Sequence, residues 1–75
     1  MTDPTIHTTV SPAGATIAIR NGYAIRADLK VRGYHFDGSN GGALWIKHVA
    51  RTDPTAADEA AWLRATGYPQ TMSVA

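Results

Sequence analysis

A single glycine between two patterns of different period constrains the fold of this chain most. Before it, Ile25 and Leu29 lie one helical turn apart and predict the inner face of a helix. Gly33 follows, and glycine suits the left-handed residue that ends many helices. After it, residues 34–36 alternate aromatic, polar and aromatic, which is the period of a strand. The order predicts a helix that stops at Gly33 and continues at once as a strand.

A second strand follows over residues 43–49, after a polar loop at 37–42. Leu44 and Ile46 share one face of this strand, and Trp45, Lys47 and Val49 lie on the other. The loop is rich in glycine, but no Gly-Lys-Ser/Thr follows and it does not open a helix, so it does not fit a phosphate-binding P-loop. We therefore expect a simple hairpin connection.

The N-terminal part predicts another hairpin. Residues 6–10 and 15–20 alternate apolar and polar side chains with many β-branched residues, and Pro12 to Gly14 supply turn chemistry between them. Asn21 is then expected to cap a helix over residues 22–32 through its side-chain oxygen.

The last predicted element is an alanine-rich helix that runs to Thr66 and ends at Gly67. Asp53 followed by Pro54 predicts one start, and a capping box from Thr55 to Asp58 predicts another two residues later. Residues 70–75 are expected to form a frayed tail.

Together these elements predict the α+β class. We expect a single domain over residues 1–75, flexible at 1–5 and 70–75, with the order strand, strand, helix, strand, strand, helix. The sheet is expected to be antiparallel, with both helices on one face. The predicted core consists of Ile17, Ile19, Ile25, Leu29, Tyr34, Phe36, Leu44, Ile46, Trp62 and Leu63.

Length and composition agree with one small globular domain. Of 75 residues, 44% are hydrophobic and 17% charged, and there is no cysteine for a disulfide or a thiolate metal site. No apolar run approaches the roughly 20 residues of a membrane span. The first residues lack the basic and apolar regions of a signal peptide, so a cytoplasmic location is the default expectation.

No constellation of catalytic residues is apparent. His7, His35 and His48 each stand alone on a predicted strand, and nothing in their spacing gathers them into a zinc site. Asp58 and Glu59 are adjacent on a helix and therefore diverge. We expect no catalytic residues, no metal and no cofactor.

Charge is unevenly distributed along the chain, although the net charge is only +1. Residues 20–51 hold six cations and two carboxylates, and residues 52–75 hold three carboxylates and one arginine. Solvated polar faces explain this, and so does a basic patch that meets phosphates or an acidic protein. The predicted partner-binding residues are Arg26, Lys30, Arg32, His35, Trp45 and Lys47. For Trp45 a core position is the alternative.

Three stretches carry a family resemblance: 29–36 (LKVRGYHF), 44–49 (LWIKHV) and 59–68 (EAAWLRATGY). They resemble a small module found C-terminal to some 3′–5′ exonucleases of the DNA polymerase III epsilon (DnaQ-like) type. Phe36 stands where that family usually has tryptophan, and the first hairpin lies outside the resemblance. The acidic residues of the exonuclease belong to its other domain. The resemblance therefore implies a nucleic-acid-associated accessory fold without nuclease activity.

Two functions follow as hypotheses. The first is a small inhibitor or adaptor that occupies a site on a nucleic-acid-processing protein or ribonucleoprotein complex. By size and class alone, the chain looks like the anti-CRISPR proteins of phages and mobile elements. The second is a free-standing module that binds DNA or RNA directly through charge and stacking. A third, structural reading is a subunit that oligomerises to cover its sheet. The sequence leaves the oligomeric state open.

Overall fold

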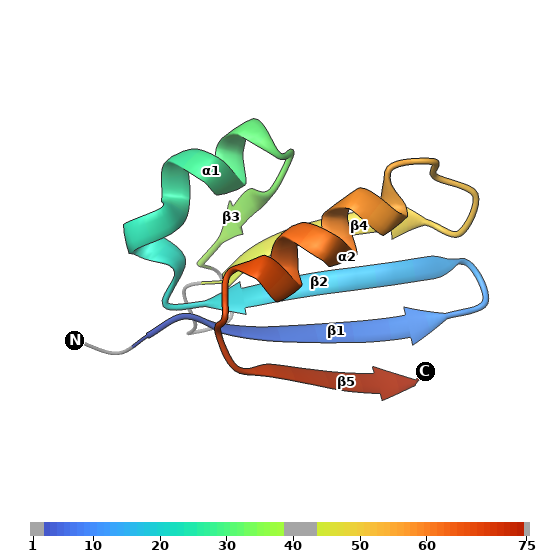
Figure 1. Ribbon diagram of the computed structural model, residues 1–75, viewed down its shortest axis with the longest axis horizontal. Coiled ribbons are helices and arrows are strands. Elements are labelled where there is room, and N and C mark those ends of the chain that lie inside the picture. The colour runs from blue at the N-terminus through green and yellow to red at the C-terminus, as the bar shows by residue number, and fades with distance from the viewer. Residues whose placement is uncertain (1–2, 39–43, 75) are drawn as a thin grey trace.

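Five strands form one mixed sheet in the computed structural model, which describes residues 3–38 and 44–74 (Figure 1). The strand order is β3-β4-β2-β1-β5. Neighbouring strands are antiparallel except β1 and β5, which are parallel. The strands are β1 (Thr5–Ser11), β2 (Gly14–Arg20), β3 (His35–Asp37), β4 (Leu44–Ala50) and β5 (Gln70–Val74).

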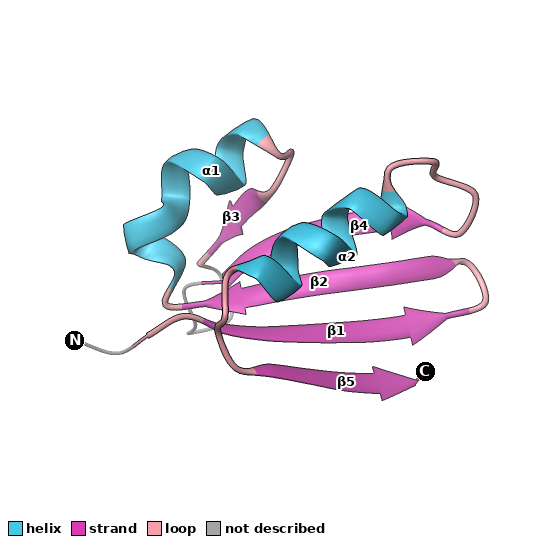
Figure 2. Ribbon diagram, viewed as in Figure 1, coloured by secondary structure: helices cyan, strands magenta, loops and turns pink. Residues whose placement is uncertain are grey.

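The predicted α+β class is confirmed, and the purely antiparallel sheet is wrong. Two helical segments accompany the strands (Figure 2). The 3-10 turn η1 (Gly22–Ile25) leads into α1 (Arg26–Val31), and α2 (Ala56–Ala65) connects β4 to β5. No helix within the described ranges has the length and apolar character needed to cross a membrane.

The turn between β1 and β2 depends on Gly14. Its φ is +147°, and a Cβ at this position would lie 2.2 Å from the carbonyl oxygen of Val49. Only glycine fits so close to the neighbouring backbone. The Arg51 N–H also donates to the Ala13 carbonyl (3.0 Å), so the predicted turn is bonded to the residue that follows β4.

Gly33 ends α1 as the sequence predicts. Its φ is +91°, its N–H donates to the Lys30 carbonyl (3.2 Å), and the Tyr34 N–H donates to the Leu29 carbonyl (2.9 Å). These two bonds form a Schellman motif. At the other end the prediction is wrong in detail. Asn21 precedes η1 with φ +60°, but its side chain makes no capping hydrogen bond.

The helix α2 begins at Ala56, in agreement with the later of its two predicted starts. The side chain of Thr55 makes no capping bond, so the predicted capping box is absent. Instead, the N–H and hydroxyl of Thr55 both donate to Asp53 Oδ1, at 2.8 and 2.7 Å. These bonds, the hydroxyl first, lower the pKa of the Asp53 carboxyl.

One face of the sheet carries the core and is covered by both helices. Leu29 from α1 and Leu63 from α2 pack on side chains that point inward from β1, β2 and β4. The buried hydrophobic residues are Ile6, Ile17, Ile19, Leu29, Tyr34, Trp45, Val49 and Leu63. Ile25, Ala56, Trp62 and Tyr68 lie at its margin.

The strand β4 presents the opposite face to the core from the one predicted. Trp45 pairs with Ile19 and Lys47 pairs with Ile17, so the face with Trp45 and Val49 turns inward. Leu44 and Ile46 lie on the uncovered face and are only half-buried. Phe36 shares the inner face but is 55% exposed, since it lies on the short edge strand β3.

Residues 70–74, predicted as a frayed tail, form the edge strand β5. The Ile6 N–H donates to the Pro69 carbonyl, and the parallel pairing then runs from Gln70 to Val74. The Gln70 amide also donates to the Leu63 carbonyl at the end of α2 (2.8 Å), so the strand is tied to both the sheet and the helix. Most of the predicted loop at 37–42 and Ala43 lie outside the described residues.

Candidate functional site

The six predicted partner-binding residues lie in four different places. Trp45 is in the core, Arg32 and Lys47 contact a buried carboxylate, and Arg26 and Lys30 project from α1. His35 lies on the uncovered face of the sheet. The predicted basic face is therefore not one continuous surface.

Trp45 is only 7% exposed and is a core residue. Its ring meets Phe36 edge to face, with the ring centroids 5.2 Å apart. Gly22 packs closely against the Trp45 ring and Leu29, since a Cβ at position 22 would lie 3.0 Å from each of them. The structure thus gives Trp45 the core position that the sequence left open as the alternative, with little surface for stacking on a base.

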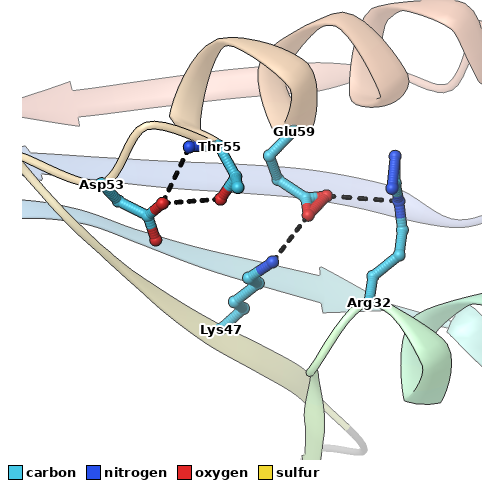
Figure 3. A network of polar contacts seen from close by, with 5 residues as sticks. All are labelled: Arg32, Lys47, Asp53, Thr55 and Glu59. Atoms are coloured by element: carbon cyan, nitrogen blue, oxygen red, sulfur yellow. Dashed lines mark hydrogen bonds and ion pairs between the residues drawn. The ribbon is translucent and has the colours of Figure 1, made fainter.

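Arg32 and Lys47 flank Glu59, which is 4% exposed (Figure 3). The Lys47 ammonium donates to Glu59 Oε1 at 2.8 Å, and Arg32 Nε lies 3.4 Å from Oε2. Lys47 belongs to β4, Arg32 follows α1, and Glu59 belongs to α2. A buried carboxylate requires such partners, because removing a charge from water is costly.

Two aromatic rings complete this group, which we call the Glu59 cluster: Arg32, Tyr34, Lys47, Glu59 and Trp62. The Arg32 guanidinium lies 4.3 Å from the centroid of the Trp62 ring, and the Lys47 ammonium 5.7 Å from that of Tyr34. Burial raises the pKa of the Tyr34 hydroxyl, and the nearby Glu59 charge raises it further. The cluster therefore links β4, α2 and the segment that follows α1.

Arg26 and Lys30 remain exposed on the outer side of α1, one turn apart. Tyr23, in η1, is 73% exposed beside them. The Arg26 guanidinium lies 3.8 Å from the centroid of the Tyr23 ring, and its Nη1 donates to the Tyr23 carbonyl at 2.8 Å. We call these three residues the Tyr23–Arg26–Lys30 surface. On this surface, Arg26 is stacked on Tyr23 and both side chains are accessible to solvent.

An open hollow of about 570 Å³ adjoins this surface. Its lining combines two tyrosines, one cation and one carboxylate with small side chains. The lining residues are Asp3, Pro4, Asn21, Tyr23, Ala24, Arg26 and Tyr68. A hollow of this character can receive a protruding side chain of a partner.

All three histidines lie on the uncovered face of the sheet. Nδ1 of His48 is 3.0 Å from the Thr16 hydroxyl, and Nδ1 of His7 is 2.6 Å from the Thr71 hydroxyl. The His35 and His48 rings are 6.3 Å apart, and His7 lies on β1, with β2 between it and β4. Within residues 3–38 and 44–74, no three His, Asp or Glu side chains are grouped to hold a metal ion.

The other exposed arginines are dispersed. Arg20 is at the end of β2, Arg51 follows β4, and Arg64 is on α2. Arg51 lies at the opposite end of the sheet from η1, because β2 pairs Gly14 with Ala50 there. The exposed cations of the described residues are therefore spread over separate elements and do not form one broad basic surface.

Sequence reasoning missed Tyr23 and Glu59, although a signal existed for both. Tyr23 precedes Arg26 by three residues, the spacing of neighbours on a helix. Glu59 lies three residues after Ala56 and four residues before Leu63, both of which face the core, so helical periodicity places it on the buried side of α2. A buried glutamate in turn calls for cationic partners.

Comparisons with protein-family models, curated proteins and solved structures found no match to this chain. The resemblance to the exonuclease-associated module therefore stays a hypothesis that rests on its motif.

Proposed function

We propose that this chain is a small non-catalytic binding protein that docks on an acidic surface of a nucleic-acid-processing complex. The observation that carries the proposal is the Tyr23–Arg26–Lys30 surface, where a stacked arginine and an exposed tyrosine lie beside a hollow. Tyrosine and arginine are enriched among the residues that dominate binding energy at protein interfaces.

The fixed position of Arg26 supports this role. A long cationic side chain normally loses rotamer freedom when it binds, and this loss weakens association. Stacking on Tyr23 and the bond to the Tyr23 carbonyl restrict Arg26 before any partner arrives. Lys30 adds a second charge one turn away on the same face. Asp28 lies two residues from each cation, a spacing that does not bring helical side chains together.

Inhibition of the target complex, in the manner of anti-CRISPR proteins, is the finer form of this proposal. It rests on the small size of the chain and on the absence of a recognisable catalytic motif in its sequence. Direct binding of DNA or RNA is the second candidate, since the same cations and Tyr23 suit phosphates and bases. The involvement of Arg32 and Lys47 with Glu59 favours the first candidate, because it leaves fewer cations for phosphates.

The test of the first candidate compares four baits in one lysate with quantitative mass spectrometry: the wild type, Tyr23→Ala, Arg26→Glu and Arg51→Glu. Arg51→Glu makes the same charge change at the far end of the sheet. We expect a retained complex to be lost with the first two variants and kept with the third. With the purified partner, Tyr23→Ala and Arg26→Glu should each weaken binding by about ten- to thirtyfold. Equal retention by all four baits would reject this surface.

The second candidate is tested by fluorescence anisotropy with short single-stranded and duplex DNA over a range of salt concentrations. If Arg26 and Lys30 contact phosphates, the log-salt slope should be about −2, and each reversal should remove about one unit. A slope near zero would exclude direct binding through these residues.

A further inference from the structure

The strand β5 is an edge without the usual protection against pairing. It lies at one end of the sheet order, and each of its residues is exposed. Natural edge strands are commonly shielded by a charged residue, a proline, a bulge or a covering segment. Residues 70–74, Gln-Thr-Met-Ser-Val, contain neither a charge nor a proline. They leave a five-residue edge open to another strand.

The pairing with β1 determines which backbone groups face outward. The Ile6 N–H bonds to the Pro69 carbonyl, and Ile6 is the partner of Gln70. In a parallel pair with this pattern, residues 69, 71 and 73 direct their backbone groups toward β1. The N–H and C=O groups of Gln70, Met72 and Val74 therefore point away from the sheet.

Two of these residues, Met72 and Val74, present an apolar surface. Gln70, Met72 and Val74 pair with Ile6, Thr8 and Val10, so their side chains lie on the face that the helices cover further inward. Met72 is 71% and Val74 83% exposed. Met72 also borders a hollow of about 270 Å³ between α2 and the sheet, whose lining includes Ile17 and Leu63.

We propose that two copies of this chain associate through their β5 edges, in antiparallel orientation, into one continuous sheet. With the two-fold axis at Met72, Gln70 of one copy pairs with Val74 of the other, and Met72 pairs with Met72. Each of these pairs exchanges two N–H···O bonds. The outward groups described above are the groups that this register uses.

A second copy is the fitting occupant because the edge is complementary to itself. An antiparallel two-fold arrangement places the same residues on both sides, as isologous interfaces require. Because β5 carries no charge, no like charges oppose each other in this pairing. The edge at β3 has only three residues, His35–Asp37, and cannot form an equally long pair.

The first test needs no mutation. Amide hydrogen exchange followed by NMR over a range of protein concentrations separates the two edges of β5. We expect the Thr71 and Ser73 amides to be protected at all concentrations, because they bond to β1. The Met72 and Val74 amides should become protected only as the concentration rises. Fast exchange of both outward amides at every concentration would overturn the proposal.

The second test measures mass by sedimentation equilibrium, where the dimer has twice the chain mass of 8.0 kDa. Met72→Pro removes an outward N–H and keeps residue 71 in the extended region that a strand needs. We expect it to weaken dimerisation by about tenfold or more. Met72→Lys should act similarly, because the two-fold axis at Met72 places the two lysines directly opposite each other, while Val31→Lys, at an exposed site on α1, should not.

Circular dichroism shows whether each variant is folded. A wild type that stays monomeric at millimolar concentration would contradict the proposal, as would a dimer unchanged by Met72→Lys in a folded protein. A protein that stays monomeric but binds an extended peptide along β5 would also overturn the proposal, because the partner of the edge would then be another chain.

Discussion

At the scale of single residues, Glu59 explains most about the charges of this protein. It is a buried carboxylate with two cationic neighbours from two other elements. The helical spacing of α2 contains a signal for the burial of Glu59. Its partners, Arg32 and Lys47, come from two other parts of the chain. A pairing of this kind depends on how α1, α2 and β4 meet, and local sequence patterns do not specify it.

Glu59→Gln should lower the free energy of unfolding by about 2–4 kcal/mol. The reason is that Lys47 and Arg32 would keep their charges without a carboxylate, at sites only 19% and 28% exposed. Urea unfolding followed by tryptophan fluorescence measures the loss. Asp58→Asn, an exposed neighbour on the same helix, is the control and should cost less than about 1 kcal/mol. Equal losses for the two variants would show that burial of Glu59 has no energetic weight.

Tyr34 predicts a pH dependence of stability. Its pKa in the folded protein lies above the ordinary value of 10.0, first because of burial and then because of the Glu59 charge. The folded state therefore holds the phenol proton more tightly than the unfolded chain. This stabilisation is complete below pH 10 and is lost as the pH rises beyond 10 toward the folded pKa. The loss has a slope of at most about 1.4 kcal/mol per pH unit.

The check is urea unfolding of the wild type and Tyr34→Phe between pH 8 and pH 11. The variant has no phenol to ionise, so its stability should fall less steeply above pH 10. The same decline in both proteins would assign the effect to other groups.

At the scale of elements, the sequence predicts alternation well and the direction of a face less well. It placed Trp45 and Lys47 on one side of β4 and Ile46 on the other, and that division is correct. Which side faces the helices depends on the register with β2, where Trp45 meets Ile19. A lysine two residues after a tryptophan favours an outer face in local sequence reasoning, because its carboxylate partner lies on another element.

The strand β5 illustrates a second limit. Its polar and apolar residues alternate from Thr71 to Val74, a signal typical of a strand. Its partner is β1, more than 60 residues away in the chain (His7 and Thr71 are 64 apart). Closing such a long loop is a property of the whole fold, which local propensity cannot predict. By contrast, Gly33 was predictable because its hydrogen bonds are local.

The orientation of β4 leads to a direct comparison of two neighbouring residues. Trp45→Ala should cost about 3–5 kcal/mol, since it empties the space of a core aromatic side chain. Ile46→Ala should cost about 1–2 kcal/mol, because Ile46 is half-buried on the uncovered face. Thermal unfolding followed by circular dichroism measures both. A larger loss of stability for Ile46→Ala than for Trp45→Ala would contradict this orientation and favour the face with Leu44 and Ile46 as the one in the core.

At the scale of the whole molecule, the cations divide into two groups with different roles. Arg32 and Lys47 hold the Glu59 cluster together, while Arg26 and Lys30 project from α1 beside Tyr23. The sequence identified all four as candidates for partner binding, because each is a cation near the helix end or the second hairpin. Only the packing of three distant segments separates the structural pair from the accessible pair.

Denaturant unfolding of four matched charge reversals tests this division most directly: Arg26→Glu, Lys30→Glu, Arg32→Glu and Lys47→Glu. Lys47→Glu should be the most destabilising, by about 3–5 kcal/mol, because it places a second carboxylate against buried Glu59. Arg32→Glu should follow, while Arg26→Glu and Lys30→Glu should each stay within about 1 kcal/mol of the wild type. Four equal and small effects would contradict the account, because all four cations would then belong to one solvated surface.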